Sequence, residues 1–364
     1  MKILIEKHHA EAALRRVVSV VEKRNTITIL GNVMLTVKDG KLTCRTAGMD
    51  MEAVETVPCQ AEAHGETTVY AVKLYDIVRN FPNGAVIKME IPADDPRLAV
   101  SCGRSKFRLP VTTPKDFPVM TASEWPISFE INAKAFAAIL AKASWAAAVN
   151  EARYALNGTF VHVIDGNLRA VATNGMRLAY AQTACDAPAD FKAILPSKMT
   201  NELQRRLAEE DGDVTVNASP SRLSVTMGDA AISSKLIEGD YVDYQRMIPE
   251  NPLTLRADAD ALSDAIKSAL LISEGKVRSV KCSISGQTMT VTARSADAEA
   301  YDEIEVDYAG DDVTIGLNGE QVMNAIGAIN ADAIEILLST AKRPVVLRKV
   351  DDASCVVALG HTVA

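Results

Sequence analysis

The chain has 364 residues, more than one hydrophobic core usually serves, so two or three domains are expected. Its composition, 48% hydrophobic and 24% charged, is that of an ordinary soluble globular protein. The net charge of −8 argues against a surface that binds nucleic acid everywhere, although it leaves room for a local basic patch.

The first third of the chain predicts a strand and a helix, then a hairpin, then a second strand and helix. The apolar run 3–5 precedes an amphipathic segment at 9–14. Two alternating runs flank Asp39-Gly40, a strong hairpin signal because glycine tolerates the positive φ of tight turns. The run 69–73 enters a second helix, and a further strand follows at 85–87.

The same series of elements recurs twice, at intervals of about 120 to 126 residues. In the second copy the first strand, first helix, hairpin turn, entry to the second helix and last strand are at 129–131, 135–140, Asp165-Gly166, 194–198 and 213–216. In the third copy the same elements are at 255–257, 261–266, Ser285-Gly286, 314–318 and 333–337. Landmarks repeated in one order indicate an internal threefold repeat. The repeat predicts three domains, at residues 1–126, 127–252 and 253–364.

No apolar stretch is long enough to predict a membrane span. The richest, 136–149, is interrupted by Lys142 and predicts an amphipathic helix. Residues 1–7 contain too short an apolar run for a signal peptide. We therefore expect a cytoplasmic protein with no membrane partner.

The residue patterns of an active site or a metal site are missing from the sequence. The cysteines form no Cys-x-x-Cys pair, and no histidine stands at metal-ligand spacing, so small packed thiols are favoured over disulfides or a zinc site. There is no glycine-rich phosphate loop. The histidines at the start of the first helix, His8 and His9, and in a polar loop, His64, are interpreted as solvated. His162 alternates within a strand and is interpreted as packed or exposed without chemistry. We predict no catalytic residue, cofactor or metal.

Basic residues gather on or beside the predicted helices despite the acidic total. They are Lys7, Arg15, Arg16, Lys23, Arg24, Lys73, Arg79, Lys134, Lys142, Lys198, Arg205, Arg206, Lys267, Lys276 and Arg278. Two interpretations stay open. The lysine and arginine stems can simply cover ordinary amphipathic helices, or the helices can share one surface that neutralises a phosphate backbone.

Five segments carry a resemblance to a known family. In the second third they are 153–158, 171–179 and 233–249, and in the first third 29–32 and 101–107. These segments resemble the bacterial DNA polymerase III beta subunit, the sliding clamp, and the resemblance runs in register along the whole chain.

The resemblance implies an α+β fold of three similar clamp domains, each with two helices packed on antiparallel sheets. Two chains would join head to tail as a ring-shaped homodimer around duplex DNA. Contacts to phosphates carry no sequence information, so such a ring can slide. The implied function is a non-catalytic processivity factor without a cofactor. Its implied partners are double-stranded DNA, a second copy of the chain, the DNA polymerase III alpha subunit, the clamp loader delta subunit and other proteins with the clamp-binding motif.

The family's functional residues map onto three sets of positions. The DNA-facing set is Arg24, Lys73, Asn150, Tyr154, Lys198 and Arg205. The partner-peptide groove is Leu156, Thr173, Gly175, Met176, Arg177, Leu178, Val242, Arg246, Met247, Asn318, Val346 and Leu359. The ring-closing interface is Arg104 and Lys106 facing Glu299, Asp302, Glu303 and Glu305, with Leu271 and Ile272 as its apolar centre. In the groove, the aliphatic side chains would line an apolar pocket, and Arg177 and Arg246 would frame it with donors.

Three positions depart from the family pattern. Ala155 stands where a second aromatic residue is common, and Met176 where histidine is common. The chain lacks the family's Met-Pro-Met-Arg-Leu-like tail, so Leu359 is expected to replace one apolar contact and Gly360 to loosen the backbone where proline is usual. The tail raises the alternative of a specialised or drug-resistant clamp paralogue with altered partner selectivity. An enzyme of nucleotide metabolism is the remote alternative.

Overall fold

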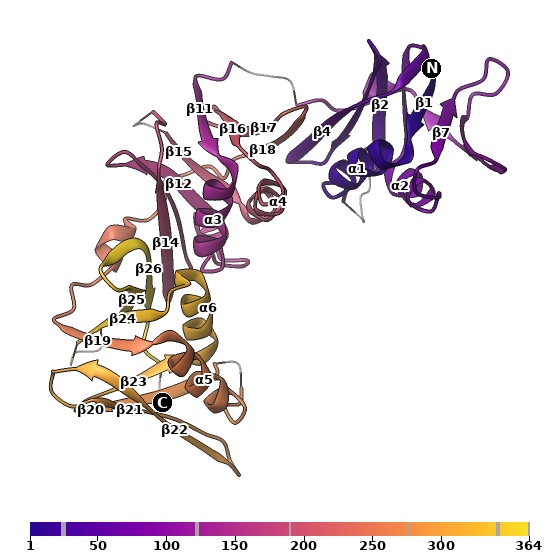
Figure 1. Ribbon diagram of the computed structural model, residues 1–364. Coiled ribbons are helices and arrows are strands. Elements are labelled where there is room, and N and C mark those ends of the chain that lie inside the picture. Colours follow the sequence, from indigo (N-terminus) through magenta and orange to yellow (C-terminus); the bar gives the residue numbers. More distant parts are fainter. Residues whose placement is uncertain (23–26, 121–123, 189–190, 276, 340–342, 363–364) are drawn as a thin grey trace. The chain divides into compact units, whose positions relative to one another are not determined.

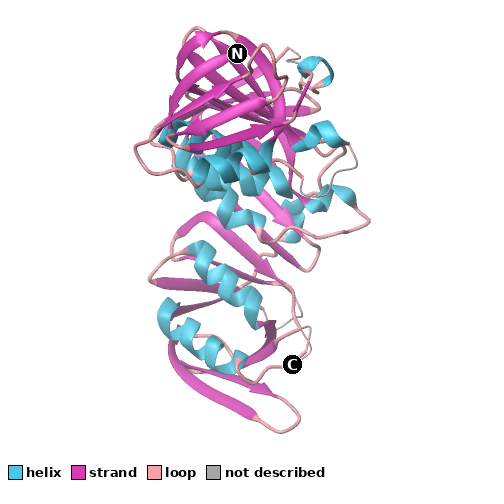
Figure 2. Cartoon of the chain, turned by 90° about the vertical axis from the view of Figure 1, so that its right-hand side faces the viewer, coloured by secondary structure: helices cyan, strands magenta, loops and turns pink. Residues whose placement is uncertain are grey.

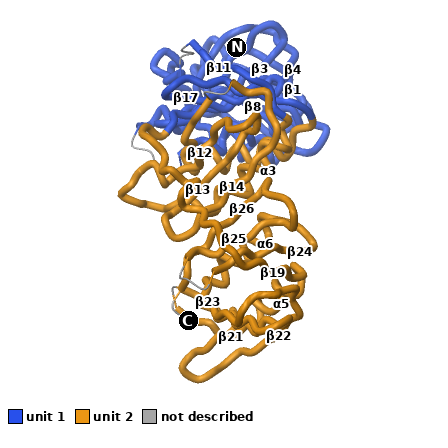
Figure 3. Tube along the Cα trace, turned by 90° about the vertical axis from the view of Figure 1, so that its left-hand side faces the viewer, with its two compact units in different colours: residues 1–131, 212–236 blue, residues 132–211, 237–364 orange. Residues whose placement is uncertain are grey.

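The structure is a computed structural model that describes residues 1–22, 27–120, 124–188, 191–275, 277–339 and 343–362. The chain forms two compact units (Figure 3). Unit 1 comprises Met1–Ile131 and Gly212–Leu236, and unit 2 comprises Asn132–Asp211 and Ile237–Ala364.

Unit 1 places a pair of helices against antiparallel sheets (Figure 1). The helices are α1 (Lys7–Val18) and α2 (Ala71–Arg79), with the 3-10 turns η1 (Thr28–Gly31) and η2 (Pro114–Asp116). One sheet has the order β5 (Gln60–Ala63), β1 (Lys2–Glu6), β7 (Val86–Glu90), β8 (Leu98–Cys102), β9 (Ser105–Leu109). The other has the order β10 (Val111–Thr112), β6 (Gly65–Tyr70), β2 (Asn32–Lys38), β3 (Lys41–Ala47), β4 (Met51–Pro58), β18 (Ala230–Lys235), β17 (Arg222–Met227), β16 (Asp213–Ala218), β11 (Ile127–Asn132).

Unit 2 contains two such helix pairs, and Figure 2 shows helices lying along strands in the same manner. The pairs are α3 (Ala133–Ser144) with α4 (Ser197–Leu207) and α5 (Ala259–Leu270) with α6 (Gly319–Ile329), and the 3-10 turns are η3 (Tyr154–Asn157) and η4 (Tyr244–Met247). The sheet order is β15 (Lys192–Pro196), β12 (Gly158–Ile164), β13 (Asn167–Thr173), β14 (Arg177–Ala184), β26 (Asp352–Leu359), β25 (Val345–Lys349), β24 (Ala333–Leu338), β19 (Leu253–Asp258), β22 (Glu299–Tyr308), β21 (Thr288–Arg294), β20 (Ser279–Ser285), β23 (Val313–Asn318).

The threefold repeat is confirmed by the order of these elements. The helices α1, α3 and α5 begin at Lys7, Ala133 and Ala259, which are 126 residues apart in both steps. The sheets run across the copies: β4 pairs with β18, and β14 pairs with β26. Because strands of neighbouring copies share one sheet, the boundaries predicted at 127 and 253 stay predictions.

The hairpins form where glycine was expected to allow them. Asp39 and Gly40 have φ near 49° and 72°. Asp165 and Gly166 have nearly the same values, 49° and 71°. In the third hairpin Ser285 still belongs to β20, and Gly286, with φ of 56°, is the first loop residue. Glycine at that first position suits a type II′ turn, so the third turn differs from the other two by one residue.

Helix starts and buried faces follow local sequence signals. The Asn132 side chain accepts a hydrogen bond from the Ala135 N–H and caps α3, and Asp258 caps α5 through the Ala261 N–H in the same way. The buried face of α3 has the period of an amphipathic helix and consists of Ala133, Phe136, Ala137, Ile139, Leu140 and Ala143. Among the described residues, no helix is long and apolar enough to cross a membrane.

The interpretation of a basic first helix needs correction. The helix α1 ends at Val18, before Lys23 and Arg24, and these two lie outside the described residues. Lys7 is 6% exposed, and Arg206 in α4 is 3% exposed and ion-paired with Glu202. Neither side chain presents its charge to a phosphate backbone.

Candidate functional site

Strand alternation builds one apolar cluster in unit 2. Leu178 pairs with Ala358, and Tyr180 pairs with Val356, so these four side chains lie on one face of the β14–β26 pair. The buried members of the cluster are Val171, Leu178, Tyr180, Tyr244, Val346, Val356 and Ala358. Half-buried Phe160, Tyr241, Val242, Met247, Ile248 and Leu337 pack against them. The predicted groove residues Leu178, Val242, Met247 and Val346 are therefore brought together.

A polar network holds η4 against the sheet. The Tyr244 hydroxyl lies 2.9 Å from His162 Nε2 and accepts a hydrogen bond from Arg169 Nη1 at 3.0 Å. The Arg169 guanidinium also lies over the Tyr180 ring, 4.4 Å from its centre, and its Nε donates to Gln182 at 2.8 Å. Burial lowers the pKa of His162 and raises that of Tyr244, so both rings are neutral near pH 7.

Sequence reasoning missed this network. His162 and Arg169 are direct cross-strand partners in the hairpin that was predicted around Asp165-Gly166. A polar pair at matching positions of a predicted hairpin was the available signal. Tyr244, which contacts both His162 and Arg169, is distant from them in sequence, and no local pattern predicts that contact.

A tight turn before β14 fixes the backbone of several predicted groove residues. The Thr173 hydroxyl donates to the Arg177 carbonyl at 2.7 Å and accepts from the Gly175 N–H at 3.0 Å. Gly175 has φ of 88°, which disfavours any other residue there. The turn leaves the Met176 side chain exposed, at 62%.

The two arginines expected to frame the pocket differ from each other. Arg177 lies half-buried over the Trp145 ring, and its guanidinium is directed at the Ala146 and Ala147 carbonyls, each 3.5 Å away. Burial lowers the pKa of Arg177. Arg246 is exposed and pairs with the neighbouring Asp243, at 2.8 Å. Of the two, Arg246 is the donor that can turn toward a ligand.

Leu156 and Asn318, two further predicted groove residues, also lie outside the apolar cluster. Leu156 is 1% exposed and sits in η3, where its carbonyl accepts a hydrogen bond from the Ala148 N–H at 2.9 Å. Asn318 caps α6 by accepting from the Gln321 N–H at 3.1 Å. Both side chains therefore have structural roles of their own.

The C-terminal segment is held more firmly than its sequence suggests. Leu359 is the last residue of β26 and is 1% exposed. The Gly360 N–H donates to the Met176 carbonyl at 2.8 Å, and the Thr362 N–H donates to the Gly316 carbonyl at 2.9 Å. A Cβ atom at Gly360 would lie 2.9 Å from the Met176 oxygen. The backbone that Gly360 was expected to loosen is thus held by a hydrogen bond, and glycine lets the segment approach the turn before β14 closely.

The predicted DNA-facing residues differ in their availability. Lys73, Asn150, Tyr154 and Lys198 are exposed, and Tyr154 reaches 68%. Arg205 is half-buried and ion-paired with Glu202 at 2.7 Å. Arg24 lies outside the described residues.

Most of the predicted interface residues are exposed within their own units, whereas Ile272 and Asp302 are half-buried. In unit 1, Arg104 and Lys106 are exposed at the edge strand β9 and the turn before it. In unit 2, Leu271 is 84% exposed, and Glu299, Glu303 and Glu305 alternate along the outer face of β22. Asp302 has the opposite parity in that strand, so it faces the other side of the sheet from these glutamates.

Three helix pairs packed on antiparallel sheets that run across the repeated copies are the architecture of a DNA clamp. Family models describe residues 1–121, 130–243 and 245–359 as the N-terminal, central and C-terminal domains of the DNA polymerase III beta subunit. The chain belongs to the DNA polymerase III beta subunit family. It is accordingly a processivity factor of a DNA polymerase and not an enzyme, and the paralogue alternative is not favoured.

Relatives match along nearly the whole chain. The beta sliding clamp of Caulobacter vibrioides is 36% identical over 352 residues, 94% of this chain and 95% of that protein. The Escherichia coli K12 beta sliding clamp is 31% identical over 347 residues, 93% of each. The Pseudomonas aeruginosa sliding clamp bound to griselimycin has a TM-score of 0.96 with 28% identity and full coverage of both chains. The Caulobacter crescentus clamp with polyethylene glycol bound has a TM-score of 0.95, 34% identity and full coverage.

Proposed function

We propose that two copies of this chain join head to tail as a ring around duplex DNA and tether a replicative polymerase to it. Membership of the clamp family supports the ring. Three repeats per chain supply several similar helix pairs, so no single pair has to bind DNA tightly. Enclosure then provides the residence time, and sequence-independent phosphate contacts leave the ring free to slide. The proposed compartment is the cytoplasm, and the proposed domains are 1–126, 127–252 and 253–364.

The DNA contacts are assigned to the exposed members of the predicted set. Lys73 and Lys198 stand in the first turns of α2 and α4, the second helices of their copies, and both are exposed. Asn150 and Tyr154 are exposed in the segment that follows α3. Arg205 has to release Glu202 before it can reach a phosphate, so it contributes less.

The partner groove is assigned to the open side of the apolar cluster. Val242 and Met247 are half-buried there, so their free faces can receive apolar side chains of a peptide. Met176 and Arg246 are exposed, and in this proposal they supply the groove with an adaptable side chain and a donor. The proposed ligands are segments of the DNA polymerase III alpha subunit, the clamp loader delta subunit and other proteins with the clamp-binding motif.

Ring closure is assigned to opposite charges around an apolar centre. Leu271 exposes most of its side chain, so it is available for an apolar contact with a partner chain. Acidic residues of β22 and basic residues near β9 would set the register, and the apolar contact would supply more of the affinity. High salt should therefore weaken closure only in part.

The DNA topology experiment tests the ring. The purified protein, loaded onto nicked circular DNA by a clamp loader, is expected to remain bound through gel filtration and to be lost once the circle is cut. Enclosure predicts this difference because a ring can leave only over a free end. Equal retention on circular and linear DNA would contradict the proposal.

The peptide experiment tests the groove separately. Met247→Ala is expected to weaken binding of a fluorescently labelled polymerase alpha subunit motif peptide about tenfold, because truncation removes half-buried apolar contact. Met49→Ala is the matched control, since Met49 is 55% exposed in unit 1, and it should bind like the wild type. Leu178→Asp is a poorer test because Leu178 is only 2% exposed and supports the fold. Equal affinity of the wild type and Met247→Ala in fluorescence anisotropy would show that the groove is misplaced.

A further inference from the structure

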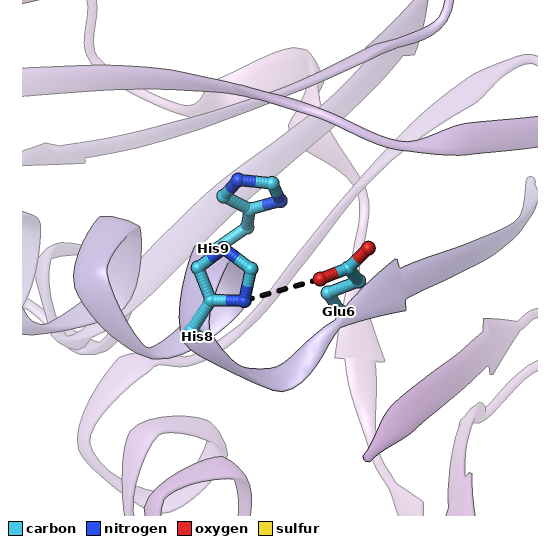
Figure 4. A group of neighbouring side chains, drawn as sticks. All are labelled: Glu6, His8 and His9. Carbon is cyan, nitrogen blue, oxygen red and sulfur yellow. Dashed lines mark ion pairs between the residues drawn. The ribbon is translucent and has the colours of Figure 1, made fainter. Parts of the chain in front are cut away.

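We propose that Glu6, His8 and His9 form a binding site for one Zn²⁺ ion at the junction of β1 and α1. One ligand atom from each side chain can be chosen so that all three lie within 4.8 Å of one another. Figure 4 shows the His8 ring facing the Glu6 carboxylate, with His9 beside it. These residues belong to none of the DNA, groove or interface sets.

The junction between strand and helix brings the three side chains together. β1 ends at Glu6, and α1 begins at the next residue, so the chain bends from extended to helical between Glu6 and His8. His8 Nδ1 lies 3.2 Å from Glu6 Oε2. The His8 and His9 ring centres are 3.9 Å apart. Two adjacent histidines and a nearby glutamate do not match the usual metal-ligand spacings, so no metal was expected from the sequence.

The comparison of the three copies sets this junction apart. Asn132 and Asp258, at the positions equivalent to Glu6, each cap the following helix with their side chains. Glu6 has no capping hydrogen bond, and its carboxylate is turned toward His8 instead. The positions equivalent to His8 and His9 are Lys134 and Ala135 in the second copy and Asp260 and Ala261 in the third. The ligand set is therefore an addition to the first copy and not a consequence of the repeated fold.

The ammonium group of the intervening Lys7 is held by partners outside the ligand set. Lys7 is 6% exposed, and its ammonium group contacts Glu11 at 2.6 Å and Asn83 at 3.0 Å. Its backbone N–H donates to the Ala85 carbonyl at 2.8 Å. Lys7 thus fixes the first turn of the helix while its charge points away from the histidines. The positive end of the helix dipole disfavours a cation here, but by much less than zinc–ligand bonds favour it.

The chemistry of the set favours zinc over harder cations. Two imidazoles and one carboxylate are ligands that Zn²⁺ accepts, with a position left for water, whereas Mg²⁺ and Ca²⁺ prefer oxygen alone. Zinc bonds of 2.0–2.1 Å in a tetrahedron separate neighbouring ligands by roughly 3.3 Å. The 3.2 Å between His8 Nδ1 and Glu6 Oε2 already matches that separation. The ion would lie between these two atoms.

A cavity beside the ligands gives room for the remaining coordination positions. It has a volume of about 280 Å³ and is bordered by Glu6 and His9 together with Cys59 and Gln60. Cys59 borders the cavity, but it does not belong to the group of ligand atoms that lie within 4.8 Å of one another. Exposure of His8 and Glu6 lets both side chains adjust by rotamer changes around an ion.

Zinc titration of the full-length protein tests the site. We expect one Zn²⁺ per chain in a competition assay with a chromophoric chelator, and weakening of about tenfold or more in His8→Ala, His9→Ala and Glu6→Gln. His64→Ala is the matched control, since His64 is an exposed histidine of the same unit, and its affinity should stay within twofold of the wild type. Zn²⁺ should also raise the thermal midpoint of the wild type and leave that of the His8→Ala/His9→Ala variant unchanged.

Two results would overturn the zinc site. One is a wild-type affinity no higher than that of the double histidine variant. The other is a loss in His64→Ala equal to the loss in His8→Ala, which would indicate nonspecific binding to surface histidines. Far-ultraviolet circular dichroism of each variant establishes that the fold is intact, and Glu6→Gln keeps the test open if the double variant folds poorly.

Discussion

Gly158→Ala is expected to lower the stability of unit 2 by about 3 kcal/mol, because the site has no room for a methyl group. Gly158 begins β12 with φ of −136° and ψ of 177°, an extended conformation that any residue adopts. A Cβ atom there would lie 2.5 Å from the Leu195 carbonyl oxygen and 2.9 Å from the Ile237 Cδ1 atom. Since Leu195 and Pro196 pair with the start of β12, the strands must separate to relieve the contact with the backbone oxygen.

Gly327→Ala is the matched control for this prediction. Gly327 lies inside α6, has no positive φ, and has no atom of another part of the chain within 4 Å of the place where a methyl group would stand. Alanine there should stabilise the helix by about 0.5–1 kcal/mol.

Tryptophan fluorescence measures the stability of these variants. The chain has two tryptophans, Trp125 and Trp145. In a Trp125→Phe background, Trp145 fluorescence during urea unfolding reports unit 2 alone. Equal midpoints for Gly158→Ala and Gly327→Ala would contradict the steric argument.

Local sequence signals predicted the repeat and its turns because those signals act over a few residues. Asp39-Gly40 and Asp165-Gly166 adopt positive φ at both positions, as the hairpin prediction required. The period of apolar residues located the helices, and the capping residues Asn132 and Asp258 fixed where two of them begin. The family resemblance then supplied the function, which charge and composition alone left open.

Long-range contacts account for what the sequence did not predict. Nothing local indicates that Met51 in β4 pairs with Ser234 in β18, although this pairing joins two copies into one sheet. Burial was equally hidden: Lys7 was interpreted as one of the basic helix residues, yet its ammonium group contacts Asn83 from another part of unit 1. Tyr244 lies in a segment that carries the family resemblance, but its hydroxyl belongs to the polar network around η4. Such roles are set by residues distant in sequence and emerge only in the folded chain.

The second large effect on stability is expected at Gly360, directly after the final strand β26. Gly360→Pro is expected to lower the stability of unit 2 by about 2 kcal/mol, although proline is the usual residue of the family in this tail. The substitution removes the N–H that donates to the Met176 carbonyl at 2.8 Å. It also adds a Cβ atom only 2.9 Å from that oxygen. The Met176 carbonyl therefore loses its hydrogen-bond donor and must also move to relieve the steric contact.

Gly360→Ala separates these two causes, because alanine keeps the N–H and adds only the Cβ atom. We expect stability to fall in the order wild type, Gly360→Ala, Gly360→Pro, followed by Trp145 fluorescence as above. The same carbonyl belongs to Met176, which borders the proposed groove, and Leu359 pairs directly with Arg177. Loss of the Gly360 hydrogen bond should therefore also weaken motif-peptide binding, and more in the proline than in the alanine variant. A proline variant as stable and as tightly binding as the wild type would mean that the tail is not held by this contact. In that case the apolar groove would depend on the β14–β26 pairing alone.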